Sequence, residues 1–227
     1  MREITSLAGV ALLRTILLIV GALFPIVNPL GNAPIFLSLT RDYSSAIRTV
    51  LARKIAINGF ILLIVSLLIG TNILDFFGIS LPVVQVGGGL VVIATGWKLL
   101  NRRDEEAPQR ADHPPRPSDI AQRAFYPLTL PLTVGPGSIS VAIAVGANRP
   151  AGVDTGWPLL AAACVGAAAI GVSIYLSYRF AETIARVLGE AAMNVVIRLS
   201  SFILLCIGVQ IAWNGVSALL RTVVRPV

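Results

Sequence analysis

The sequence predicts an all-α polytopic membrane protein with six transmembrane spans. Of the 227 residues, 56% are hydrophobic and 13% are charged, and the mean hydropathy is +0.83. Long apolar segments alternate with short charged ones along the whole chain. A water-soluble core of this size does not bury so many apolar side chains, whereas ~20 apolar residues form a helix that matches the thickness of a bilayer.

The first apolar segment, about residues 8–40, is longer than one straight crossing of a ~30 Å hydrocarbon core. Arg14 interrupts its beginning and no cleavage site follows, so we expect an uncleaved span whose arginine reaches the interface rather than a signal peptide. A charged, proline-rich linker at 101–122 separates a first half (1–100) from a second half (123–227). The remaining spans are expected at 55–74, 82–100, 124–147, 157–178 and 199–220.

Two apolar spans contain proline clusters with the same spacing, FPIVNPLGNAPIF at 24–36 and YPLTLPLTVGPGS at 126–138. Proline removes a backbone N–H and crowds the preceding turn, so both spans are predicted to break near mid-membrane. The matched positions, at one constant offset, are Pro25, Pro29 and Pro34 with Pro127, Pro131 and Pro136.

The matched clusters indicate an internal repeat of three spans. Because an odd number of crossings inverts the second half, the two repeats should be related by a pseudo-two-fold axis in the membrane plane. Two glycine matches at a second constant offset, Gly89 with Gly208 and Gly96 with Gly215, support the repeat weakly.

Most of the 18 Lys and Arg residues lie in the connections between spans one and two, three and four, and five and six. The positive-inside rule therefore predicts that both termini are periplasmic. The net charge of +7 is explained by these loops, so we do not expect a nucleic-acid partner.

Each break should create a helix start inside the membrane, at Asn32-Ala33-Pro34 and at Gly135-Pro136-Gly137-Ser138. Helix starts offer N–H donors and partial positive charge, and the preceding half-helices offer carbonyl acceptors. A zwitterion can bind to both the donors and the acceptors without a charged side chain of the protein. No charged side chain is expected at mid-depth. The candidate substrate-binding residues are Asn28, Gly31, Asn32, Thr129, Thr133, Gly135, Gly137 and Ser138.

A simpler explanation remains open for these polar side chains. Asn, Thr and Ser near a proline also satisfy carbonyls that the proline leaves free. Interhelical hydrogen bonding explains the other polar residues of the spans at least as well as a site does. These residues are Asn58, Gln85, Gln210 and Asn214.

With NPLGNAPIFLSLT at 28–40 and PLTVGPGSIS at 131–140, the chain resembles the MarC family, the six-span small neutral amino acid transporter family. The resemblance covers all six spans and leaves out the linker. It implies a bacterial inner-membrane protein with inverted three-helix repeats, discontinuous first and fourth spans, and transport of glycine and alanine dependent on a cation gradient. By motif match it assigns substrate contact to Asn28, Gly31, Asn32, Thr133, Gly135, Gly137 and Ser138.

The expected function is therefore a secondary transporter of small neutral amino acids by alternating access, with no cofactor beyond a possible coupling Na⁺ or H⁺. The alternative is an exporter or channel for another small solute. An enzyme is not expected, because Ser138 has no His or Lys base at its depth and no Asp-rich metal motif occurs. His113, Cys164 and Cys206 have no metal-ligand spacing. The oligomeric state stays open.

Overall fold

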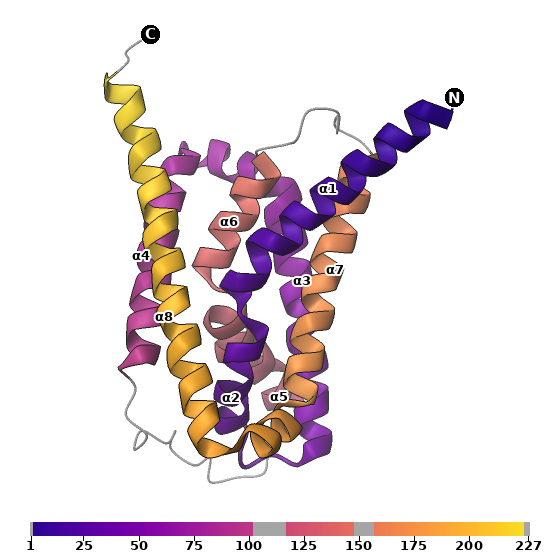
Figure 1. Cartoon of the computed structure of the whole chain (residues 1–227), viewed down its shortest axis with the longest axis vertical. Helices are drawn as coiled ribbons and strands as arrows, with labels where there is room; N and C mark the ends of the chain where they lie inside the picture. The colour runs from indigo at the N-terminus through magenta and orange to yellow at the C-terminus, as the bar shows by residue number, and fades with distance from the viewer. Residues whose placement is uncertain (1, 102–116, 148–156, 225–227) are drawn as a thin grey trace.

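The computed structural model describes residues 2–101, 117–147 and 157–224, and all regular elements in these ranges are helical (Figure 1). The predicted all-α polytopic membrane class is confirmed, because five helices are long and apolar enough to cross a membrane, or six if one bent pair is a single span. The elements are α1 (Arg2–Val27), α2 (Pro29–Leu39), α3 (Ser45–Phe76), α4 (Leu81–Leu100), α5 (Pro117–Arg123), the π-helical η1 (Ala124–Thr133), α6 (Pro136–Ala147), α7 (Trp157–Arg179) and α8 (Ala181–Val224).

Two helices begin earlier than the hydropathy pattern places them. α5 begins at Pro117, inside the predicted linker, where proline occupies a first-turn position that needs no N–H. α8 begins at Ala181 and contains Gly189 at φ 73°, a left-handed conformation that separates residues 181–188 from the long apolar part. Residues 102–116 of the predicted linker lie outside the described ranges.

The helices pack mainly between the two halves of the sequence. α4 packs on α8 and α6, α3 packs on α7 and α6, and α1 packs on α7. Several contacts depend on glycine: a Cβ on Gly89 would lie 2.5 Å from the Ala212 backbone nitrogen, and one on Gly208 would lie 2.7 Å from the Ile93 nitrogen. Small residues thus let the backbones of α4 and α8 approach closely.

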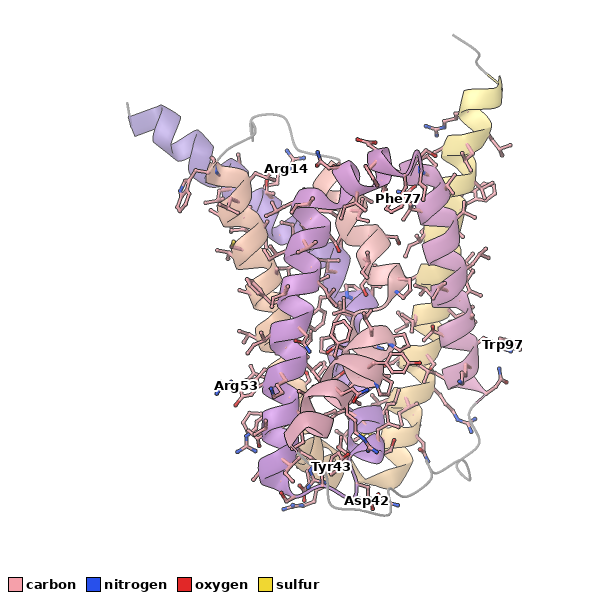
Figure 2. The ribbon with its side chains drawn as sticks, turned by 180° about the vertical axis from the view of Figure 1, so that it is seen from behind. Arg14, Asp42, Tyr43, Arg53, Phe77 and Trp97 are labelled. Carbon is pink, nitrogen blue, oxygen red and sulfur yellow. The ribbon has the colours of Figure 1, made fainter. Side chains whose placement is uncertain are left out.

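The bundle has two chemically different ends. The start of α1 and the end of α8 lie at the same end (Figure 1). Arg14 and Phe77 lie at that end, whereas Asp42, Tyr43 and Arg53 lie towards the other (Figure 2). We call this second end the basic end, because the start of α3 and the junction of α7 and α8 bring Arg48, Arg53, Lys54, Arg179 and Arg186 there.

Candidate functional site

The first helix interruption is a single residue. α1 ends at Val27, Asn28 adopts a left-handed conformation (φ 46°, ψ 58°), and α2 begins at Pro29. Asn28 caps α2, since its Oδ1 accepts a hydrogen bond from the N–H of Gly31 at 3.2 Å. The predicted helix start at residues 32–34 is wrong by one turn, because the asparagine before Pro29 already provides a cap and Pro29 already provides a first-turn proline.

Asn32 therefore lies at the end of the first turn of α2, where it is buried. Its Nδ2 donates to the carbonyl of Val27 at 2.9 Å and to the carbonyl of Leu132 at 3.1 Å. The Val27 carbonyl belongs to the end of α1, and the Leu132 carbonyl belongs to η1 of the second half. One side-chain amide thus joins the two interrupted segments.

The second interruption is larger. The axis turns by 68° between residues 120–133 and α6, across Val134 and Gly135. η1 contains Pro127 and Pro131, with extended backbone at Tyr126 and Leu130, and the Val134 N–H donates to the carbonyl of Thr129 at 2.9 Å. Pro136 is the first residue of α6, whereas Pro25 and Pro34 lie inside helices that continue past them.

Two buried threonines satisfy carbonyls of the π-helical segment. Thr129 Oγ1 donates to the carbonyl of Ala124, and Thr133 Oγ1 donates to the carbonyl of Leu128, both at 2.6 Å. Asn58 of α3 reaches Thr129 Oγ1 at 3.5 Å, which ties α3 to this segment. These contacts are of the kind that the simpler explanation expects, because both hydroxyls pair with carbonyls of their own proline-containing segment.

Ser138 serves the start of α6. Its Oγ accepts from the Gly135 N–H at 3.0 Å and lies 3.1 Å from the Gly135 carbonyl, to which it donates. A side chain in the first turn that reaches back to the preceding N–H is the geometry of a capping box.

The three candidate glycines provide room for neighbours. A Cβ on Gly31 would lie 2.6 Å from the Ser200 Cβ, one on Gly135 would lie 2.8 Å from the Pro131 carbonyl oxygen, and one on Gly137 would collide with Val92. These positions bring α2 against α8 and α6 against α4. Their glycines are thus required by packing around the interruptions, whatever else they contact.

Sequence reasoning missed an aromatic pair beside Thr133. Tyr178 of α7 lies 2.7 Å from Thr133 Oγ1, and its ring stacks on Phe36 of α2, with centroids 4.5 Å apart and planes 8° apart. Because the single Thr133 proton goes to the Leu128 carbonyl, Tyr178 is the donor in this pair. A tyrosine at the end of a span is typical of an interfacial anchor, so the position of Tyr178 in the sequence does not predict its contacts with Thr133 and Phe36.

The structure brings most predicted site residues to one region and buries them. The Thr129, Thr133, Asn32 and Ser138 side chains are 0–4% exposed. Gln210 and Asn214 pair with each other on an exposed face of α8, at 2.8 Å. The arrangement brings together two helix starts, a shared asparagine and a tyrosine that bridges both halves. Asn32 and Tyr178 are buried, whereas Asn28 and Gly135 are half-buried and Pro136 is exposed.

The electrostatic field at the two interruptions comes from backbone N–H and C=O groups rather than from charged side chains. Within the described ranges, the carboxylates of Asp42, Asp75 and Glu182 lie at helix ends. No cluster of three metal-ligating side chains occurs among the described residues. Helix starts and freed carbonyls are therefore the polar groups that a ligand would meet here.

A family model described as MarC family integral membrane protein matches residues 13–220 of this chain. The chain belongs to the MarC family. It is 32% identical over 205 residues to the UPF0056 inner membrane protein MarC of Citrobacter koseri, covering 88% of this chain and 93% of that protein. It is 31% identical over 199 residues to the UPF0056 membrane protein YvbG of Bacillus subtilis, covering 87% and 92%.

The MarC protein of Salmonella typhimurium is 30% identical over 205 residues, with coverage of 88% and 93%. No solved structure matches this chain. Membership of the MarC family and the apolar helices together establish a multi-pass protein of the inner membrane. The matched range contains both interruptions and every predicted site residue.

Proposed function

We propose that this MarC family protein is a secondary transporter of small neutral amino acids, of the glycine and alanine type, that works by alternating access. The observation that carries the proposal is the hydrogen bonding of Asn32, whose one amide group reaches carbonyls at both interruptions. Carriers built from repeats hold their substrates where interrupted helices of two halves meet.

The polar groups of this region match a zwitterion. Both N–H bonds of the Asn32 amide are used by carbonyls, so its Oδ1 is the group that can accept from a substrate ammonium. The starts of α2 and α6 offer N–H donors and partial positive charge to a substrate carboxylate. A charged substrate side chain would need a counter-ion, which favours glycine and alanine.

An inverted repeat is part of the proposal, and the α4–α8 contacts support it. Gly89 meets Ala212, and Gly208 meets Ile93. The sequence offset between Gly89 and Gly208 equals the offset between Ile93 and Ala212. If each residue of one helix is replaced by its counterpart in the other helix, the first contact therefore becomes the second. The contacts of Gly96 with Leu205 and of Gly215 with Val86 repeat in the same way. A two-fold axis between the halves has this property.

The burial of the proposed site supports alternating access rather than a permanent pore. Solvent reaches the buried side chains of Asn32, Thr133 and Ser138 only if the two halves move relative to each other. The contacts that must then change are those between halves: Asn32 with Leu132, and Phe36 with Tyr178.

The proposed orientation places both termini in the periplasm and the basic end in the cytoplasm, following the positive-inside rule. Alkaline phosphatase is active only outside the cytoplasm. We therefore expect a C-terminal phosphatase fusion to be active and a C-terminal green fluorescent protein fusion to be dark. The reverse pattern would reject this orientation.

If transport is coupled, the coupling ion is Na⁺ or H⁺. Sodium held by carbonyls near the interruptions, or facilitation without coupling, suits these residues better than proton coupling, which usually employs a carboxylate or histidine in the pathway.

The test is counterflow of labelled glycine into proteoliposomes preloaded with glycine or alanine, with sodium and pH gradients imposed in turn. Saturable exchange supports a carrier, and the gradient that drives accumulation identifies the coupling ion. Non-saturable flux would favour a channel instead. An absence of flux from folded protein would favour an exporter of another small solute.

Variants then test the site. We expect Asn32→Ala and Thr133→Ala to abolish glycine binding while the protein still elutes as a folded species in detergent. Thr133→Ser should retain binding because it keeps the hydroxyl. Ser66→Ala is the matched control, since Ser66 is buried in α3 and bonds its own helix at Leu62. Wild-type binding in both alanine variants would reject the site.

A further inference from the structure

The first two turns of α8 form a surface helix. Residues 181–188 cross the basic end of the bundle between α7 and the long part of α8 (Figure 1), and Gly189 turns the chain at φ 73°. The side chains of Phe180, Ile184, Val187 and Leu188 recur at helical spacing and so share one face. Phe180 is 50% exposed and Val187 is 79% exposed.

This segment is held to the bundle at its start. Ala181 is buried, and the Glu182 carboxylate lies 2.7 Å from the guanidinium of Arg48 on α3. The side chains of Phe180, Val187 and Leu188 stay exposed at the level where the transmembrane helices end. Large apolar side chains are also exposed on the adjoining parts of α7 and α8, at Leu176 and Val195.

The charge of this surface is positive. Among the side chains that the structure describes at 179–188 and at Arg48, three arginines accompany one carboxylate, that of Glu182, which lies 3.6 Å from Arg186 and closer to Arg48. The Arg179 guanidinium lies 5.8 Å from the centre of the Phe180 ring, so a cation and an apolar anchor are adjacent. Two positive charges thus remain uncompensated within this group.

The opposite end offers a useful contrast. The connection between α3 and α4 exposes Phe76 and Phe77, at 85% and 66%, and residues 75–80 contain no Lys or Arg. Both connections expose large apolar side chains at the ends of the spans, but only the α7–α8 connection adds surplus cations. Surplus cations favour contact with an anionic lipid surface over a neutral one.

We propose that residues 179–188 dock on anionic phospholipids of the leaflet at the basic end. Phe180, Val187 and Leu188 enter the boundary of the acyl chains, and Arg179 and Arg186 bind the lipid phosphates. An apolar face beside arginines is the composition by which helices lie in a membrane interface. This inference does not depend on what the protein transports.

The test uses a single fluorescent bimane on Val187→Cys in a Cys164→Ala/Cys206→Ala background. The protein is placed in vesicles of equal phosphatidylcholine and phosphatidylglycerol, of which one or the other carries brominated acyl chains that quench bimane. We expect quenching by both lipids, and about twofold more by brominated phosphatidylglycerol, because each basic residue near an anionic surface favours it severalfold.

Two controls make the result specific. Bimane on Asp42→Cys, in an exposed turn at the same end, should be quenched little by either lipid. Arg179→Gln/Arg186→Gln should make the two lipids equal quenchers at residue 187, whereas Arg221→Gln, near the end of α8, should not. Quenching at 187 no greater than at 42 would overturn the docking. Equal quenching by both lipids in the parent protein would overturn the choice of anionic phospholipid.

Discussion

The ring of Tyr178 stacks on the ring of Phe36 with 4.5 Å between centroids, while its hydroxyl reaches Thr133 at 2.7 Å. Phe36 belongs to the first half of the chain, and Tyr178 and Thr133 belong to the second. The tyrosine therefore has two separable roles: its ring holds the halves together, and its hydroxyl orients the threonine. Substitutions can remove one role at a time.

Tyr178→Phe should keep the stack and lose one hydrogen bond, lowering the stability by about 1 kcal/mol. Tyr178→Ala should cost ~3–5 kcal/mol, because it also leaves a cavity against Phe36. Thermal unfolding in detergent measures both changes. If the two variants unfold at the same temperature, the stacked ring does not contribute as described.

Asn28 combines a left-handed backbone with a helix cap. Asn28→Ala should lose about 2–3 kcal/mol, because alanine neither caps the helix nor tolerates a positive φ. Asn28→Gly should lose less than about 1 kcal/mol, because glycine adopts this conformation freely and is a fair cap. We expect the Asn28→Gly variant to unfold at a higher temperature than the Asn28→Ala variant. Equal unfolding temperatures would contradict the argument from the left-handed backbone.

Gly89 and Gly87 provide a matched pair on α4. A Cβ at 89 would lie 2.5 Å from the Ala212 nitrogen, whereas one at 87 would meet nothing within 4 Å. Backbone atoms cannot move aside as a side-chain end can, so Gly89→Ala should destabilise the protein by ~1–3 kcal/mol. Gly87→Ala should be neutral or slightly stabilising. A neutral Gly89→Ala would mean that α4 and α8 are not in close contact.

The ion pair of Arg48 and Glu182 should contribute little by itself. The Glu182 side chain is 50% exposed, and exposed pairs are typically worth ~0.2–1 kcal/mol. A double-mutant cycle of Arg48→Ala and Glu182→Ala should give a coupling energy in that range, and smaller in high salt. A much larger coupling would mean that the pair is shielded from solvent.

Hydropathy was sufficient to predict the membrane class and most span positions, because each helix that crosses a bilayer is a continuous apolar stretch of the sequence. The start of α8 was missed because residues 181–188 are amphipathic, and a search for uniformly apolar windows passes over them. Likewise, α5 falls in a polar, proline-rich stretch where a first-turn proline is compatible with a helix.

The candidate site was only partly accessible to the same reasoning. Proline spacing identified both segments and the start of α6 at Pro136, but not that Asn28 caps α2, since that depends on local geometry. The bond from Asn32 to the Leu132 carbonyl and the partnership of Tyr178 with Phe36 join residues far apart in the chain. Such contacts depend on the packing of helices and leave no periodic signal.

The packing of α4 on α8 and α6 has a consequence for biogenesis. The first half of the chain can enter the membrane while the rest is still being synthesised, but the principal neighbours of α4, which are α6 and α8, emerge later. Until then the glycine face of α4 meets lipid. The contacts between α4 and α8 can therefore form only after residues 181–224 have been synthesised, and a ribosome that stalls earlier leaves α4 without a completed partner for quality-control proteases to recognise.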